Sequence, residues 1–140
     1  MNSTVLGLDV GTRTIGVAQA DLRSAFPSPV CTLSRKGVKT DVLRLAELCR
    51  THKVAQIVVG MPYELDGAEG RSARLARQVG EALAALTALP VEYQDERYST
   101  VDAAEQLRAA GLDSRKQREV IDQAAAMVIL SAWFRARAAT

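Results

Sequence analysis

The apolar positions in the first third of the chain predict three short strands. Residues Thr4–Val10 are mostly β-branched and aliphatic, and the turn sequence GTRT leads into a second apolar run, Ile15–Ala20. A third run, Val30–Leu33, follows two prolines. Because the connections between these runs are short, we expect a three-stranded antiparallel meander.

The pattern then alternates between helical and strand spacing. Thr40 is expected to cap a helix whose apolar face repeats every three to four residues, and a short buried strand follows at Gln56–Val59. A second amphipathic helix carries its apolar face from Leu75 to Leu86, and a further strand is predicted at Val91–Gln94.

The C-terminal part of the chain is predicted to be helical. Ser99 and Thr100 are suited to cap a short helix that reaches Gly111, and a capping-box pattern beginning at Ser114 opens a long helix that ends near Ala138. Three strands followed by helix–strand alternation indicate an α/β fold, a mixed sheet flanked by helices. The 140 residues are about the length of one domain, so we expect a single domain over 1–140.

Composition is that of an ordinary globular chain, with 48% apolar and 24% charged residues. The longest uncharged run, Gln123–Phe134, is too short to cross a bilayer, which needs about 20 apolar residues. With no secretory signal pattern at the N-terminus, we expect a cytoplasmic protein without a membrane partner. The net charge of +2 is too small to identify a nucleic-acid-binding protein by itself.

Cysteine and histidine offer little metal chemistry. Cys31 and Cys49 do not form a CxxC pair, and both are expected to be reduced residues of the core. His52, the single histidine, lies near the end of a predicted helix, where it suits the negative end of the helix dipole. A metal site must therefore use carboxylates, which favours a hard cation such as Mg²⁺ or Mn²⁺.

Asp9 is the first candidate site residue, because it ends an otherwise apolar strand. Strand alternation places it on the same face as Val5 and Gly7, and Gly11 allows the chain to turn tightly just beyond it. A purely local role, in which Asp9 accepts hydrogen bonds from the turn amides, fits the same pattern.

Asp95 and Glu96 form the second candidate, just beyond a predicted strand and before a predicted helix. Sites in open α/β sheets gather at the carboxyl ends of the strands. Acidic residues are also common at helix N-termini because of the helix dipole, so the pair has a structural explanation as well. Strand alternation does not choose between the two residues, since both lie beyond the strand.

Asp122 is the third candidate, because it interrupts a predicted helix that is apolar on most sides. A buried carboxylate must be paired, protonated or bound to a metal. A buried salt bridge, or a position at the rim of the helix, would also explain it. If the three carboxylates converge, they have the ligand chemistry to hold two cations about 3.5–4 Å apart, the arrangement that hydrolyses phosphodiesters.

Four motifs together resemble one family. They are GLDVGTRTIGVA (7–18), VVGMPYELDG (58–67), DERYST (95–100) and VIDQAAAMVIL (120–130), and they occur in the family's order. The chain resembles the YqgF family, also called RuvX, whose members are described as pre-16S ribosomal RNA nucleases and as Holliday-junction-resolvase-like proteins. The resemblance implies an RNase H-like fold with a mixed five-stranded sheet and helices on both faces.

The same resemblance implies a metal-dependent nuclease that acts on precursor ribosomal RNA or on branched DNA. Its catalytic and metal-binding residues would be Asp9, Glu96 and Asp122, with Asp95 as a less certain ligand. A homodimer is left open.

Several basic residues suit contacts with nucleic-acid phosphates. Thr12 and Arg13 follow Asp9 in the turn, and other candidates lie in the predicted helices and near Glu96, although such clusters are also common on ordinary solvated surfaces; these candidates are Arg71, Arg74, Arg77, Arg97, Arg115 and Lys116. Tyr63 and Tyr98 are the candidates for stacking on bases, or else pack locally in their loops.

Two other functions fit parts of the sequence. LGLDVGTRTIG also resembles the phosphate-binding turn of actin-like ATPases and sugar kinases, but those proteins close two such domains around ATP, and this chain has one copy of the motif. A non-catalytic module that binds nucleic acid or protein in transcription or ribosome assembly would keep the fold but would not need three carboxylates.

Overall fold

The computed structural model describes residues 2–96 and 115–138, and within the last helix it describes side chains from residue 119 onward. The strands are β1 (Thr4–Val10), β2 (Thr14–Asp21), β3 (Ser28–Ser34), β4 (Val54–Met61) and β5 (Val91–Asp95), and they form one sheet in the order β3-β2-β1-β4-β5. β1, β2 and β3 pair antiparallel, which confirms the predicted meander. β4 pairs parallel with β1, and β5 pairs parallel with β4, so the sheet is mixed.

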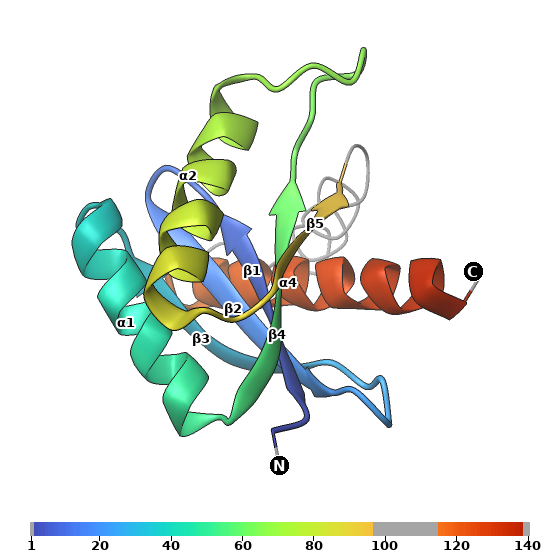
Figure 1. The fold of residues 1–140 in the computed structure, drawn as a ribbon. Helices are drawn as coiled ribbons and strands as arrows, with labels where there is room; N and C mark the ends of the chain where they lie inside the picture. The colour runs from blue at the N-terminus through green and yellow to red at the C-terminus, as the bar shows by residue number, and fades with distance from the viewer. Residues whose placement is uncertain (1, 97–114, 139–140) are drawn as a thin grey trace.

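Helices cover both faces of this sheet. α1 (Val38–Thr51) and α2 (Arg71–Thr87) lie on one face, and α4 (Arg115–Ala138) crosses the strands on the other face (Figure 1). Because β1, β4 and β5 are parallel, their carboxyl ends meet at one edge of the sheet. The predicted helix between residues 99 and 111, with its caps, and the predicted cap at Ser114 lie outside the described residues.

Each face of the sheet has its own apolar core. On the side of α1 and α2, Leu6 and Leu8 are fully buried in one cluster, whereas Val5 belongs to the cluster on the side of α4. This division confirms the predicted alternation along β1. Asp9, two residues after Gly7, consequently belongs to the α4 face.

Three glycines bring α4 unusually close to the sheet. A Cβ atom on Gly16 of β2 would lie 2.0 Å from the backbone oxygen of Asp122. A Cβ on Gly7 of β1 would lie 2.5 Å from Leu130 Cγ, and one on Gly60 of β4 would lie 2.4 Å from Ile129 Cδ1. Since real Cβ atoms do not approach other atoms this closely, the three glycines determine how near α4 packs.

The predicted N-cap of α1 at Thr40 is wrong. The helix begins at Val38, with Gly37 as its N-cap at a φ of 116°, a conformation that favours glycine. Asp41 explains the earlier start, because its buried side chain accepts hydrogen bonds from the Lys36 amide (3.0 Å) and from Arg35 Nε (2.7 Å). These contacts hold the loop before α1 against the first turn of the helix.

The strands β2, β3, β4 and β5 are longer than the sequence indicates. β2 includes Thr14 and Asp21, and β5 includes Asp95, which was expected to lie beyond the strand. β4 extends beyond the predicted 56–59 at both ends, and β3 includes Pro29. Pro29 is tolerated because β3 lies at the edge of the sheet and the pairing with β2 shifts register between Val17 and Ala18.

The cysteines and the histidine lie outside the candidate site. Cys49 is buried, Cys31 is half-buried, and both are free thiols. His52 is the C-cap residue of α1, and its Nδ1 lies 3.0 Å from Gln19 Oε1. Within the described part of the chain, no helix combines the length and the apolar character needed to cross a membrane.

Candidate functional site

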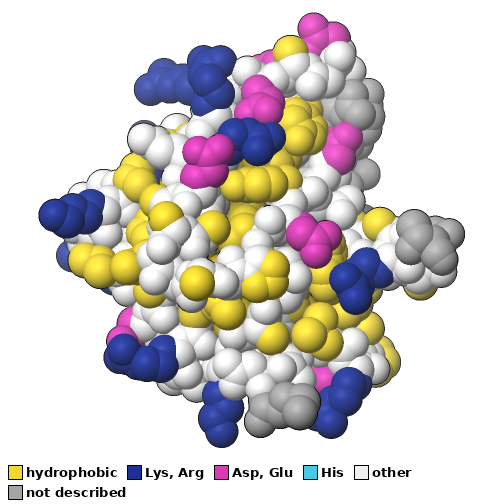
Figure 2. Space-filling model, in the orientation of Figure 1, with side chains coloured by type: hydrophobic (Ala, Val, Ile, Leu, Met, Phe, Trp, Pro, Cys, Tyr) yellow, Lys and Arg dark blue, Asp and Glu magenta, His cyan; other side chains and the backbone are white. Residues whose placement is uncertain are grey.

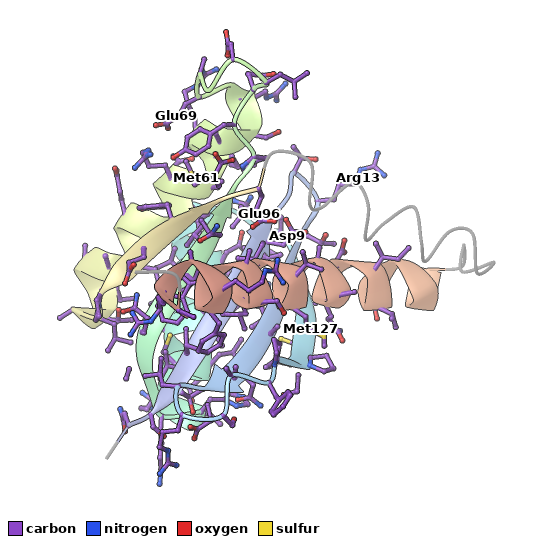
Figure 3. The ribbon with its side chains drawn as sticks, turned by 90° about the vertical axis from the view of Figure 1, so that its right-hand side faces the viewer. Asp9, Arg13, Met61, Glu69, Glu96 and Met127 are labelled. Atoms are coloured by element: carbon purple, nitrogen blue, oxygen red, sulfur yellow. The ribbon has the colours of Figure 1, made fainter. Side chains whose placement is uncertain are left out.

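Asp9 lies near the carboxyl end of β1 and faces α4. Its side chain is half-buried, and Figure 3 shows it beside Glu96, above α4. Burial, and secondly the charge of Asp122, raise the pKa of Asp9 to about 6. Within this turn the Gly11 amide donates to the Thr14 carbonyl (2.8 Å), a backbone bond that does not involve Asp9.

Glu96 follows β5 directly and is held at the same edge of the sheet. Its backbone amide donates to the carbonyl of Met61 at the end of β4 (2.9 Å), and only 4% of the residue is exposed. Neither carboxylate oxygen has a hydrogen-bond partner among the described residues.

The electrostatics of Glu96 follow from this burial. Burial, then the charges of Asp9 and Asp95, raise its pKa to about 7, and the charge of Arg135 on α4 opposes the rise. An unpartnered buried carboxylate is costly, and such a group is commonly a place where an ion or a water belongs.

Asp122 reaches the site from α4. Its side chain is half-buried, and Thr14 Oγ1 donates a 2.8 Å hydrogen bond to its Oδ2. Burial raises the pKa of Asp122, and the hydrogen bond from Thr14 opposes the rise. Asp122 forms no ion pair with any described residue, so the buried salt bridge considered from the sequence is not observed there.

The structure distinguishes the two acidic residues after β5. Asp95 is the last residue of β5 and is exposed, whereas Glu96 is buried. Asp95 acts on the site through its charge, which contributes to the raised pKa of Glu96. Thr14 was not singled out from the sequence, although its hydroxyl in the GTRT turn was a visible signal.

The carboxylates are electrostatically coupled but not gathered into a finished metal site. Asp9 interacts with both Asp122 and Glu96. Among residues 2–96 and 115–138, however, no group of three Asp, Glu, His or Cys side chains is close enough together to hold a metal ion. Mutual repulsion between carboxylates disfavours such a cluster when no cation is present.

The predicted basic residues fall into different environments. Thr12 and Arg13 are exposed in the turn after β1, and Arg71 and Arg74 are exposed at the start of α2. Figure 3 shows Arg13 extending outward from this edge. Arg97 lies outside the described residues, as do the side chains of Arg115 and Lys116.

Arg77 differs from Arg71 and Arg74 on α2, because its side chain is occupied by other residues. Its guanidinium makes two 2.8 Å hydrogen bonds to the carboxylate of Glu69 and lies over the ring of Tyr93, 4.7 Å from the centroid. These contacts raise the pKa of Arg77 and tie the loop before α2 to the helix. Tyr63 packs against the apolar core, and Tyr98 is outside the described residues.

Known structures share this fold. A Thermus thermophilus RuvC bound to a Holliday junction substrate superposes with a TM-score of 0.62 at 19% identity, covering 96% of each chain. A second structure of the same Thermus thermophilus protein gives 0.59 at 16% identity, covering 98% of this chain and 97% of the other. The fold is therefore that of RuvC, an RNase H-like resolvase, as the sequence motifs implied.

Sequence relatives are much nearer. A protein of Anaeromyxobacter dehalogenans is 45% identical over 133 residues, covering 95% of this chain and 97% of its own length. One from Mycobacterium leprae is 47% identical, covering 96% of this chain and 74% of its own. Both are named for pre-16S rRNA nuclease activity. The family model for RuvX, described as a Holliday junction resolvase, matches residues 3–136, and the chain belongs to this family.

Proposed function

We propose that this chain is a divalent-metal-dependent nuclease that hydrolyses phosphodiester bonds in nucleic acid. Asp9, Glu96 and Asp122 are its catalytic carboxylates, and Asp95 assists through its charge. The observation that carries the proposal is the buried carboxylate of Glu96, beside Asp9 at the carboxyl edge of the sheet. Its two oxygens lack hydrogen-bond partners among the residues that the structure describes. Membership in a family of nucleases supports the same reaction.

The residues present fit a hard divalent cation. Carboxylate oxygens are the ligands that Mg²⁺ and Mn²⁺ prefer. The Glu96 oxygens, which have no partner in the described part of the chain, would gain one. When bound, the cation supplies Lewis-acid stabilisation of charge and activates water for attack on phosphorus. Because Asp9 and Glu96 have raised pKa values, they would release any bound protons as they become ligands.

The surrounding residues hold these carboxylates in position. Thr14 orients Asp122 through its hydroxyl, and the Met61 carbonyl fixes the backbone of Glu96. The close approach of α4 at Gly16 brings Asp122 to the same end of the sheet. Catalysis needs reacting groups held closely in place, which this packing provides.

Precursor 16S ribosomal RNA is the substrate we propose first, because the relatives at 45–47% identity are named for it. Processing of this RNA would take place in the cytoplasm. Branched DNA is the second candidate, because the family model is described as a Holliday junction resolvase.

The direct test is cleavage of labelled precursor 16S rRNA, single-stranded RNA and a four-way DNA junction, each with Mg²⁺, Mn²⁺ or EDTA. We expect cleavage that requires a divalent cation and is abolished by Asp9→Asn and by Glu96→Gln. Glu47→Gln is the matched control, because Glu47 is an exposed carboxylate on α1. Binding without cleavage under every condition would contradict the proposal and favour a non-catalytic module.

A further inference from the structure

A basic cavity lies on the face of the sheet opposite the carboxylates. Its volume is about 560 Å³, and it opens between the turn after β1, the loop before α1 and the first turns of α2. It is lined by Thr12, Arg35, Gly37, Arg71, Arg74, Leu75 and Gln78. Figure 2, which views the face of α1 and α2, shows Lys and Arg side chains projecting at the upper left, over the start of α2.

Arg71 and Arg74, two of the three arginines of α2, bring positive charge to the cavity. The side chain of Arg71 forms no ion pair or hydrogen bond with any described residue. Arg74 Nη1 donates to the backbone carbonyl of Glu69 (3.0 Å) and pairs with no described carboxylate. None of the residues that line the cavity in the described part of the chain is acidic. The cavity is thus suited to an anion.

Arg35 is held in place before any ligand arrives. Its side chain is only 10% exposed, and its Nε donates to the buried carboxylate of Asp41 (2.7 Å). Its Nη1 donates to the carbonyl of Gly11 (2.9 Å), in the turn that follows Asp9. A guanidinium carries five N–H donors, so these two bonds leave others available for the cavity. Ordering this side chain in advance lowers the entropic cost of binding.

We propose that this cavity binds a phosphodiester of the substrate strand, away from the bond that is cleaved. The proposal rests on the proposed nuclease function, because the strand would pass over the turn between Asp9 and Thr12 to reach both places. Arginine suits such a contact, since its planar guanidinium pairs with two phosphate oxygens at once. Thr12 and Gln78 add neutral donors, and the contact reads the backbone without reading the base.

The assignment separates the arginines of α2 by role. Arg71 and Arg74 bind phosphate, whereas Arg77 is occupied by Glu69 and Tyr93 and does not. It also adds Arg35, which is distant from the α2 arginines in the sequence, and the neutral Gln78, which lies one helical turn after Arg74.

The test is binding of fluorescently labelled single-stranded RNA to the full chain in EDTA, where metal-dependent cleavage is prevented, at several salt concentrations. The double variant Arg71→Ala/Arg74→Ala should lose about tenfold or more in affinity at low salt. The slope of log K against log salt should become less negative by about one to two units. The matched control is Arg23→Ala/Arg50→Ala, which removes the same charge from two exposed arginines paired with carboxylates elsewhere.

Equal losses in the double variant and its control would overturn the proposal, because they would reflect net charge alone. Inorganic phosphate supplies a second arm, measured by calorimetry. Phosphate binding that disappears in Arg71→Ala/Arg74→Ala while RNA affinity stays unchanged would assign the cavity to a free anion and overturn the proposal.

The binding result and the cleavage result are independent. If wild type cleaves but Arg71→Ala/Arg74→Ala binds RNA normally, the cavity proposal fails and the nuclease stands. If no substrate is cleaved but the double variant loses affinity and slope as described, the cavity stands as a nucleic-acid site and the nuclease fails.

Discussion

The backbone oxygen of Asp122 occupies the space that a side chain on Gly16 would need, at 2.0 Å from the position of its Cβ. The backbones of β2 and α4 are therefore in direct contact at Gly16, two residues after Thr14 in β2. The Thr14–Asp122 hydrogen bond of 2.8 Å depends on this approach. Gly16 is also the pairing partner of Asp9 in the β1–β2 ladder. The same glycine therefore lies next to both Asp9 and Asp122.

Replacing Gly16 with alanine should displace α4 and lower both stability and activity. The clash is with backbone, which a change of rotamer does not relieve, and overpacking of this kind costs about 1–3 kcal/mol. A shift of Asp122 by about 1 Å should reduce the cleavage rate about 100-fold. Gly7→Ala is the comparison, since the three atoms nearest to its Cβ would all belong to the Leu130 side chain rather than to backbone. Thermal unfolding and cleavage should both show the larger loss for Gly16→Ala.

Asp122→Asn should abolish cleavage and leave the melting temperature equal or higher. An asparagine oxygen can still accept the hydrogen bond from Thr14, and removal of the charge relieves repulsion with Asp9. Asp41→Asn is the control, because Asp41 is a buried carboxylate that does have an arginine partner. It should lower the melting temperature. A comparable fall in Asp122→Asn would assign Asp122 a structural role.

The stability of the metal-free protein should fall as pH rises from about 4.5 to about 7. The pKa of Glu96 is raised from 4.5 to about 7 and that of Asp9 from 3.8 to about 6, so the folded state binds more protons than the unfolded state in this window. The free energy of unfolding consequently decreases with pH there. Burial raises the pKa of Asp41, but its hydrogen bonds outweigh this and the pKa is lowered. The contribution of Asp41 to stability therefore changes only below about pH 4, outside this window.

Glu96→Gln isolates the larger of these contributions. The variant should match wild type near pH 5, where Glu96 is protonated, and exceed it near pH 8 by about 3 kcal/mol. Denaturant unfolding at the two pH values, in EDTA, measures the difference. Parallel pH profiles for the two proteins would show that Glu96 is not held protonated by its surroundings.

Arg77→Ala should lower the melting temperature modestly and leave nucleic-acid binding unchanged. The substitution removes two hydrogen bonds to Glu69 and the contact with Tyr93, which join the loop before α2 to the helix and to β5. Arg74→Ala should behave in the opposite way, with an unchanged melting temperature and a salt slope smaller by about one unit. If both variants reduced the slope of log K against log salt equally, Arg77 would also be a phosphate-binding residue.

Much of the fold follows from local patterns. The alternation along β1 places Leu6 and Leu8 in one core and Asp9 on the opposite face, because successive side chains of a strand point to opposite sides. Asp122 is visible as a polar residue in an apolar helix for a similar reason. The motifs also indicated the family and the mixed sheet with helices on both faces.

Tertiary structure decided what the local patterns left open. Asp95 ends β5 and Glu96 follows it, and only the packing of α4 and β4 determines that Glu96 is the one removed from water. Arg71 and Arg77 have the same spacing to Arg74, yet among the described residues only Arg77 forms an ion pair, with Glu69 of the loop before α2. Local spacing determines which face a residue occupies. Desolvation and ion pairing depend on which other elements reach that face, and this is decided when the sheet and its helices pack together.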